Sequence, residues 1–362
     1  MSSRLERVQA RLAETATDLI VVGPSSHLVW LLGLSPHGDE RPVMLIATPE
    51  KAAILMPALN ADSQRPHTDL PFYTWADADG PHAALTSLLT DLGITGANLR
   101  VALDETMRAD FALLILDALK SPRHTFLAET LGHLRAQKDQ EEFALLKAAA
   151  RIDDEAMAAA FAHAKPGMTE LELDGFIRDF FRSRGARPEF TIVGFGENGA
   201  FPHHHSSERV LKADDTLLID IGCRIGGYPS DMTRVGTIGR KPAEFDEVHA
   251  TLDQAVRAAV AAARPGVKAS AVDAAARDII IAAGYGPNFL HRTGHGLGID
   301  IHEPPYITAT SDTVLEAGNV FSIEPGIYLA GRFGVRLEEI VFLDKDGAKI
   351  LSELKRDAFT VG

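Results

Sequence analysis

The sequence predicts two domains, an α/β domain followed by a strand-rich α+β domain. The chain has 362 residues, and because globular domains average about 150 residues, this length suits two of them. Short apolar segments alternate with helical ones up to about residue 130, which is typical of an α/β sheet covered by helices. From Glu189 onwards, apolar segments separated by Gly and Pro turns predominate, and two helical segments lie among them. We expect the domains to span residues 1–130 and 131–362, with the junction near residues 128–135.

The N-terminal domain is expected to begin with an amphipathic helix, in which Leu5, Val8 and Leu12 recur at spacings of three and four residues. The apolar segments that follow are interrupted by Gly and Pro, and Pro49-Glu50 separates two of them as a hairpin turn would. The sequence predicts strands at residues 18–23, 43–48, 51–57 and 100–105, a helix that starts after Gly80-Pro81 and runs to about residue 94, and a second helix at residues 106–119.

The C-terminal domain is expected to begin with a helix from about Lys138, rich in Ala, Glu and Leu, that Pro166-Gly167 stops. Thr169 resembles the N-cap of a second helix that ends around Gly185. Strands are predicted at residues 190–196, 216–222, 320–330 and 336–344, and two more helices at residues 242–263 and 269–283.

Composition and charge exclude several classes of function. The formal net charge is −14, whereas nucleic acids and anionic membranes bind clustered Lys and Arg. Cys223 is the single cysteine, so an internal disulfide and a Cys-rich metal site are both excluded. The sequence has no signal-peptide h-region and no apolar run of transmembrane length. We therefore expect a cytoplasmic protein that binds neither membrane nor nucleic acid.

The segment Gly194 to Gly199 matches the dinucleotide fingerprint G-x-G-x-x-G. That fingerprint must open a helix, whose N-terminus holds the pyrophosphate. The next residues, from Ala200 to His205, include a proline and three histidines, which are poor helix formers. An ordinary turn is the favoured interpretation here.

Carboxylates and histidines gather in the C-terminal half. Asp220 comes at the end of an apolar strand and Asp231 follows a Gly-Gly turn, so a hairpin would bring the two together, although either Asp alone is usually turn chemistry. His291, His295 and His302 lie within twelve residues and have glycines around the middle one, a pattern that favours a metal or proton transfer.

Two glutamates lie in apolar strands. Glu324 precedes Pro325-Gly326, and Glu338 and Glu339 follow Leu337. Burying a carboxylate is costly unless it is paired or bound to metal. Strand alternation sends Glu338 and Glu339 to opposite faces, so only one of them can join a given site.

Asp220, Asp231, His295, Glu324 and Glu338 together form a candidate ligand set. Four carboxylates balance the charge of two divalent cations. An oxygen-rich set with one imidazole suits Mn²⁺, and also Co²⁺ or Zn²⁺, better than a soft metal. Two metals sharing carboxylates would activate water for hydrolysis.

In type and order, these residues resemble the ligands of the M24-type "pita-bread" metallopeptidases, the group of methionine aminopeptidase, aminopeptidase P and prolidase. The N-terminal domain and the segments LRAQKDQEE, ENGAFPH and HRTGHGLG resemble the Xaa-Pro branch of that group. The resemblance covers essentially the whole chain. It implies a creatinase-like N-terminal domain, a pita-bread catalytic domain with a curved antiparallel sheet, and a homodimer.

The resemblance also implies a role for each residue. Asp220 would bind one metal, His295 and Glu324 the other, and Asp231 and Glu338 would bridge both. Glu324 would shuttle the proton of a metal-bridging hydroxide, and His302 would bind substrate and help stabilise the tetrahedral intermediate. His203, which the resemblance places with the catalytic residues, and His291 would line the pocket for proline, and Arg336 would lie near the substrate. His204 and His205 are expected to be exposed strand residues without a role.

Two segments bear on substrate length. Many members of the group carry Arg where this chain has Tyr306, and that Arg can bind the carboxylate of a C-terminal proline; Arg292, Arg332 or a partner residue could replace it. The segment His37 to Arg41 loosely resembles an acidic loop that some prolidases extend toward the partner's active site. Asp39 in this loop could bind the ammonium of a dipeptide, and a solvated charged turn is the equal alternative.

The resemblance predicts hydrolysis of the Xaa-Pro bond, in dipeptides by preference, so the expected partner is a small peptide with proline in second position. The alternatives are an aminopeptidase P acting on longer peptides, a creatinase-like amidinohydrolase without a working metal site, and a non-catalytic binding protein. The complete ligand set argues against the amidinohydrolase, and the intact His203, His295 and His302 argue against the binding protein.

Overall fold

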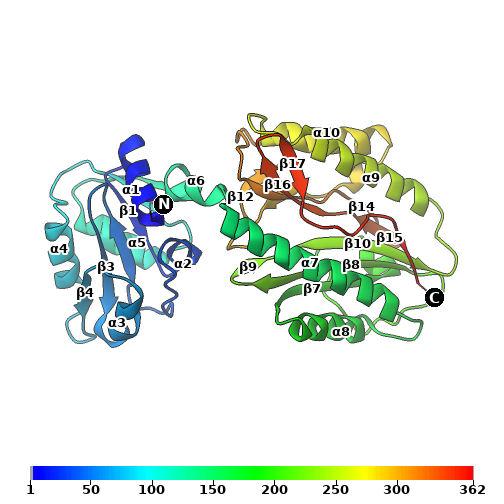
Figure 1. The fold of residues 1–362 in the computed structure, drawn as a ribbon, viewed down its shortest axis with the longest axis horizontal. Coiled ribbons are helices and arrows are strands. Elements are labelled where there is room, and N and C mark those ends of the chain that lie inside the picture. Colours follow the sequence, from blue (N-terminus) through cyan, green and yellow to red (C-terminus); the bar gives the residue numbers. More distant parts are fainter. Residues whose placement is uncertain (1–2, 362) are drawn as a thin grey trace. The chain divides into compact units, whose positions relative to one another are not determined.

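The computed structural model describes residues 3–361, and contacts divide the chain into two compact units, Met1–Arg135 and Ala136–Gly362 (Figure 1). The first unit contains a six-stranded mixed sheet with the strand order β4-β3-β2-β1-β5-β6. These strands are β1 (Leu19–Val22), β2 (Met44–Ala47), β3 (Ala52–Pro57), β4 (Phe72–Trp75), β5 (Arg100–Leu103) and β6 (Arg123–Phe126). The predicted alternation of strands and helices is confirmed in this unit.

The helices of the first unit follow from local sequence signals. Ser3 and Glu6 form a capping box that starts the first helix, whose Val8 and Leu12 are buried as their spacing predicts. Ser25 caps the second helix, and Gly33 ends it in the left-handed conformation. The helices are α1 (Arg4–Glu14), α2 (Ser26–Leu32), α3 (Ala58–Gln64), α4 (His82–Asp91), α5 (Ala109–Ala118) and α6 (Leu131–Ala136), with short 3₁₀ turns η1 (Arg65–His67) and η2 (Leu127–Glu129).

The second unit contains two five-stranded sheets and a small two-stranded one. In the first sheet the order is β18-β10-β8-β7 with β9 paired to β8, and in the second it is β12-β11-β13-β16-β17. The strands are β7 (Arg187–Phe195), β8 (Thr216–Ile225), β9 (Tyr228–Pro229), β10 (Met232–Ile238), β11 (Gly294–Gly296), β12 (Glu303–Ile307), β13 (Val320–Ile323), β14 (Gly326–Leu329), β15 (Phe333–Arg336), β16 (Glu339–Asp344), β17 (Gly347–Ile350) and β18 (Phe359–Val361).

Two helix pairs supply the cores of this unit. One core joins α7 and α8 to β7, β8 and β10, and another joins α9 and α10 to the second sheet and the β14–β15 hairpin. Figure 1 accordingly shows strands of this unit lying between α9 and α10 on one side and α8 on the other. The helices are α7 (Gln140–His163), α8 (Glu170–Ser183), α9 (Phe245–Ala262) and α10 (Ala269–Ala282), with short 3₁₀ turns η3 (Gly196–Ala200) and η4 (Gly286–Asn288).

Several local predictions are confirmed here. Thr169 is the N-cap of α8 as predicted, and the helix expected from about Lys138 starts after Asp139; both helices begin with a capping box. The segment Gly194 to Gly199 ends β7 and forms the 3₁₀ turn η3 rather than a nucleotide-binding helix. No helix within residues 3–361 is both long enough and apolar enough to cross a membrane.

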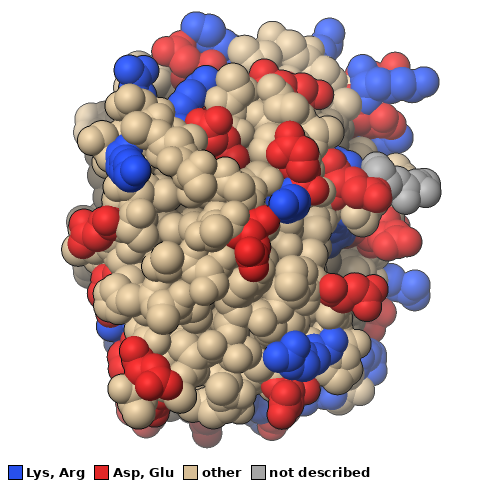
Figure 2. Space-filling model, turned by 90° about the vertical axis from the view of Figure 1, so that its left-hand side faces the viewer, with Lys and Arg blue, Asp and Glu red and all other residues tan. Residues whose placement is uncertain are grey.

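Surface charge can be followed on the molecular face drawn in Figure 2. Lysine and arginine side chains are scattered there among acidic and uncharged ones. A surface of this kind lacks the clustered cations that a phosphate backbone binds.

Candidate active site

The second unit contains a cleft of about 850 Å³. Its walls come from β7, from the loop after η3 and from the segment between β11 and β12. Several residues that the sequence singled out line this cleft: His203, Asp220, Asp231, His291, His295, His302, Glu324 and Arg336.

Asp220 and Asp231 come together through the expected hairpin. Strands β8 and β10 are antiparallel, and Asp220 lies opposite Thr233 in their register. Asp220 was predicted to end its strand, but β8 continues for five more residues to Ile225. Gly222 lies inside β8, where a Cβ atom would lie 2.4 Å from the backbone oxygen of Ser230.

His295 and Glu324 meet on two neighbouring interior strands of the second sheet, His295 in β11 and Glu324 just after β13. Strand β11 pairs with β12 and β13, and a Cβ atom at Gly294 would lie 1.8 Å from the backbone oxygen of Ser322. Glycine is therefore required for this close approach. Glu324 lies in the break between β13 and β14 rather than inside a strand, since Pro325 has no N–H to donate. His295 Nε2 lies 3.1 Å from Glu324 Oε1.

The two adjacent glutamates take different directions, as strand alternation predicts. Glu338, just before β16, has a carboxylate oxygen within 4.8 Å of ligand atoms of Asp220 and Asp231, and likewise of His295 and Glu324. Glu339 instead pairs with Arg234 at 3.1 Å and with Arg356 at 2.9 Å.

The electrostatics of these carboxylates suit bound cations. Burial, together with the neighbouring negative charges, raises the pKa values of Asp231 and Glu338 well above their usual range, and burial also raises the pKa of Asp220. Asp220 Oδ1 and Glu338 Oε1 are buried and accept no hydrogen bond from residues 3–361. A buried oxygen without a hydrogen-bond donor costs free energy. Divalent cations would coordinate these oxygens and keep the carboxylates ionised. The donor set therefore fits two hard divalent cations.

The pKa of Glu324 is lowered, unlike those of the other three carboxylates. Burial opposes its ionisation, but the hydrogen bond and positive charge of His295 prevail and lower its pKa to about 2. Ser322 Oγ donates to Glu324 Oε1 at 2.9 Å. Glu324 is thus an ionised carboxylate beside the cleft, with Oε1 already engaged.

One buried arginine links the carboxylates to the rest of the cleft. Arg336 donates to Asp220 Oδ2 at 2.5 Å, to Thr233 Oγ1 at 3.0 Å and to the Tyr328 hydroxyl at 2.9 Å. Thr233 Oγ1 in turn donates a hydrogen bond to Glu338 Oε2 at 2.8 Å, which extends the network to this second carboxylate. The donors of Arg336 are therefore directed at protein groups, which makes it a residue that positions the ligands.

His291 completes the same network. Its Nε2 lies 2.8 Å from the Tyr328 hydroxyl and its Nδ1 lies 2.7 Å from the Arg292 carbonyl oxygen, which assigns the proton to Nδ1. Burial lowers the pKa of His291. Both nitrogens have partners, so His291 offers the cleft a ring face rather than a free donor.

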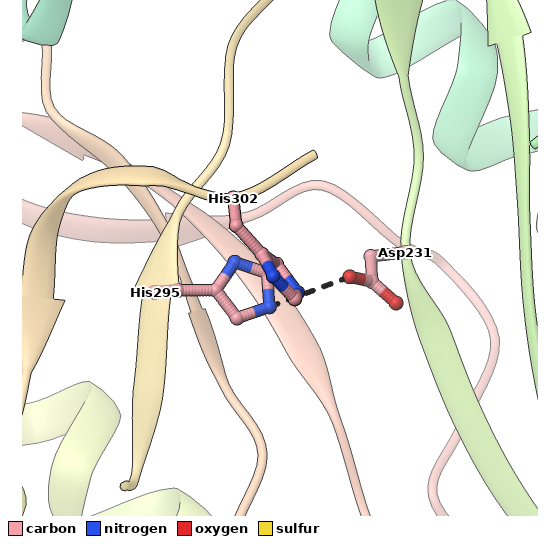
Figure 3. Close-up of side chains that lie close together, drawn as sticks. All are labelled: Asp231, His295 and His302. Carbon is pink, nitrogen blue, oxygen red and sulfur yellow. Dashed lines mark ion pairs between the residues drawn. The ribbon is translucent and has the colours of Figure 1, made fainter. Parts of the chain in front are cut away.

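His302 lies against His295, with ring centroids 4.0 Å apart. Figure 3 shows His295 and Asp231 pointing toward one another, with the His302 ring beside them; His295 Nε2 and Asp231 Oδ2 are 3.6 Å apart. Burial, followed by the charges of His295 and Arg292, lowers the pKa of His302 to about 4. The neighbouring Glu303 forms a buried ion pair with Lys138 at 2.7 Å, which anchors this segment to the start of α7.

His203 lies in the loop that follows η3, and a single carboxylate anchors that loop. Glu170 on α8 is fully buried and accepts five hydrogen bonds, from Phe195 N, Asn198 Nδ2, His204 Nε2, Ser207 N and Ser207 Oγ. The prediction that His204 and His205 are strand residues is wrong, because both lie in this loop. His205 is exposed as expected, whereas His204 is half-buried and bonds Glu170.

Asp39 belongs to the first unit. Its carboxylate accepts a hydrogen bond from the Arg41 backbone at 2.8 Å and pairs with the Arg41 guanidinium at 3.3 Å. These contacts lower the pKa of Asp39. Arg41 in turn pairs with Asp77 at 2.9 Å.

Sequence reasoning missed three residues that support the site: Tyr328, Thr233 and Ser322. Each acts by contacting a ligand or Arg336, and such contacts are set by strand pairing rather than by local pattern. Thr233 and Ser322 could have been noticed because each lies two residues from a candidate ligand, Asp231 and Glu324, a spacing that sends both side chains of an extended segment to one face.

Comparison with known proteins agrees with this geometry. Residues 144–345 match the profile of metallopeptidase family M24, and residues 4–137 match the creatinase/prolidase N-terminal domain. The chain is 36% identical to the probable dipeptidase PepE of Mycobacterium tuberculosis (99% of this chain, 96% of that one) and 31% identical to the Xaa-Pro dipeptidase of Pyrococcus furiosus (99% of each).

The crystal structure of dipeptidase PepE from Mycobacterium ulcerans superposes with a TM-score of 0.93 at 35% identity, over 99% of this chain and 97% of that one. These likenesses confirm the resemblance stated from the sequence, and with it the creatinase-like and pita-bread fold. The chain belongs to metallopeptidase family M24.

Proposed function

We propose that this chain hydrolyses the Xaa-Pro bond of dipeptides with the help of two divalent cations, for which Mn²⁺ is the first choice. The observation that carries the proposal is the overlap of ligand clusters at the cleft: Asp220, Asp231 and Glu338 form one, and His295, Glu324 and Glu338 form another. The names of the relatives support it, since they include dipeptidases and an Xaa-Pro dipeptidase.

The overlap suggests how the residues divide two cations. Glu338 belongs to both clusters, and Asp231 belongs to one with Asp220 and to another with His295. Two cations would therefore be held by these five residues, with Asp231 and Glu338 contributing to both, Asp220 to one, and His295 and Glu324 to the other. When bound, such a pair of cations activates water and polarises the scissile carbonyl.

The remaining chemistry belongs to the side chains of this protein. Glu324 is ionised, and its Oε2, which accepts no hydrogen bond from residues 3–361, would take the proton of the attacking water. His302, whose lowered pKa keeps it neutral at neutral pH, would donate a hydrogen bond to the carbonyl oxygen as negative charge develops there. His203 and His291 would enclose the proline ring on the cleft wall.

A substrate panel tests the proposal. Protein depleted of metal with a chelator and reloaded with Mn²⁺, Co²⁺ or Zn²⁺ is assayed with Ala-Pro, Ala-Ala and Ala-Pro-Ala. We expect the metal-loaded protein to cleave Ala-Pro fastest and the depleted protein to be inactive. Undiminished cleavage without metal, or faster cleavage of Ala-Ala than of Ala-Pro, would contradict the proposal.

A homodimer and a cytoplasmic location remain predictions of the resemblance. Light scattering on the purified protein measures the molar mass directly, and a mass of one chain, 39.0 kDa, would exclude the dimer.

A further inference from the structure

The backbone at Glu338 lies outside the strands on either side of it. Strand β15 ends at Arg336 and β16 begins at Glu339, which leaves Glu338 in the break between them. A buried backbone group that no strand ladder satisfies needs a partner from elsewhere. The position of the carboxylate that both ligand clusters share therefore depends on contacts outside its own sheet.

Two consecutive residues of β10 supply these contacts. Glu338 N donates to the Thr233 carbonyl oxygen at 3.3 Å, and Thr233 Oγ1 donates to Glu338 Oε2 at 2.8 Å. The Glu338 carbonyl oxygen accepts a hydrogen bond from Arg234 Nη1 at 2.5 Å. The amide, the carbonyl group and one carboxylate oxygen of Glu338 are therefore all bonded to β10, whereas Oε1 accepts no hydrogen bond from residues 3–361.

Arg234 is itself held by the C-terminal segment of the chain. Its side chain is fully buried, and it also donates to the carbonyl oxygens of Leu354 at 2.8 Å and Lys355 at 3.1 Å. Glu339 balances its charge at 3.1 Å. A guanidinium can donate in several fixed directions at once, which the single ammonium group of lysine cannot do. Arg234 thus joins the backbone of Glu338 to residues 354–355.

A second arginine joins the same group to α9. Arg356 pairs with Glu339 at 2.9 Å and with Asp253 on α9 at 2.8 Å. Glu339 therefore lies between two guanidinium groups, and its carboxylate keeps Arg234 in register with the helix. The support of the Glu338 backbone extends in this way from β10 to α9.

We propose that Arg234 is a positioning residue for the cations: it fixes the carbonyl group of Glu338, and with it the direction of the Glu338 carboxylate, and so sets the affinity for both ions. This inference rests on the proposed function, in which Glu338 contributes to both cations. A ligand that is oriented before the cation arrives loses less conformational freedom on binding. Loss of a group that orients a ligand typically weakens metal affinity by about 10- to 100-fold.

Calorimetric titration of the metal-depleted protein with Mn²⁺ tests this role in Arg234→Lys, which keeps the charge but not the planar fork. We expect both ions to bind about 10- to 100-fold more weakly than in the wild type. The Mn²⁺ concentration that gives half of the maximal rate with Ala-Pro should rise by a similar factor, whereas KM for Ala-Pro at saturating Mn²⁺ should stay within about twofold. A purely structural role would lower the fraction of folded protein and leave the metal affinity of the folded fraction unchanged.

Two further variants complete the comparison. Arg356→Met removes one partner of Glu339 and leaves every donor of Arg234 in place, so it should weaken Mn²⁺ binding by less than about 10-fold. This variant decides the question if circular dichroism shows that Arg234→Lys does not fold. Arg184→Met, which breaks an exposed ion pair with Glu155 at 2.8 Å, is the control and should bind Mn²⁺ as the wild type does.

The outcomes distinguish this inference from the proposed function. If the wild type binds no Mn²⁺ or does not cleave Ala-Pro, the proposed function fails. If the wild type does both, but Arg234→Lys, or in its place Arg356→Met, binds Mn²⁺ with wild-type affinity, the role of Arg234 is refuted and the proposed function stands.

Discussion

Arg336 shows how one buried side chain organises a group of carboxylates. Its planar fork reaches Asp220, Thr233 and Tyr328 in three directions, and through Thr233 it also orients Glu338. Lysine carries the same charge but presents it as a single ammonium group, which cannot meet three separated partners at once. The geometry of the ligands thus depends on the shape of this residue as well as on its charge.

Substitution of Arg336 should therefore cost stability as well as activity. For the metal-free protein we expect Arg336→Met to lower the free energy of unfolding by about 3–5 kcal/mol, because it leaves a buried carboxylate without its partner. Arg336→Lys should lose less free energy of unfolding, because lysine keeps the positive charge. Urea unfolding measures both, and Arg182→Met, which breaks an exposed pair with Asp179, serves as the control and should cost less than about 1 kcal/mol. A loss below that limit for Arg336→Met would contradict this role.

At the scale of elements, the loop that carries His203 is fixed by α8 rather than by a strand. Glu170 collects five donors from residues 195–207 on its two carboxylate oxygens. Because a buried carboxylate with several donors is stabilised in its ionised form, the pKa of Glu170 is lowered despite its burial, with His204 as the main partner. The conformation of the loop therefore depends on the negative charge of Glu170.

This coupling predicts a pH-dependent effect of Glu170→Gln. The amide replaces one acceptor oxygen with a donor, so we expect a loss of about 1–3 kcal/mol in the free energy of unfolding at neutral pH and a higher KM. Since the folded pKa is depressed, the stabilisation by Glu170 is present above its usual pKa and is lost as the pH falls through the lower folded pKa. The difference between wild type and variant should thus shrink in acid.

Urea unfolding at several pH values measures this difference. Glu208→Gln, an exposed change in the same loop, is the control and should have little effect at any pH. A difference between wild type and Glu170→Gln that stays constant from neutral to acid pH would refute the role of the charge.

The elements that the sequence predicted correctly are those with strong local signals. The capped helices α7 and α8 and the apolar strands β1, β7 and β8 lie where expected. The errors occur where long-range packing prevails over a local signal. Asp220 was expected at the end of a strand, yet β8 continues to Ile225, because its last residues pair with β9. His204 gave no signal, because its partner Glu170 lies 34 residues earlier.

For the whole molecule, the five ligand candidates were found because charged residues in apolar segments are unusual, whereas their supporting residues have ordinary positions. Asp220, Asp231, His295, Glu324 and Glu338 come from two sheets and converge only in the folded second unit. Four of the 50 acidic residues of the chain belong to this set, so most of the acidic surplus of −14 lies elsewhere. Two bound cations would balance those four.

The number of cations bound per chain tests the central claim most directly. Metal-depleted protein is titrated with Mn²⁺ by calorimetry while hydrolysis of Ala-Pro is followed on the same samples. We predict two ions per chain and activity that rises with their binding, and we predict that Asp231→Ala and Glu338→Ala lose both. An Asp231→Ala variant that hydrolyses Ala-Pro at the wild-type rate without bound metal would contradict the account.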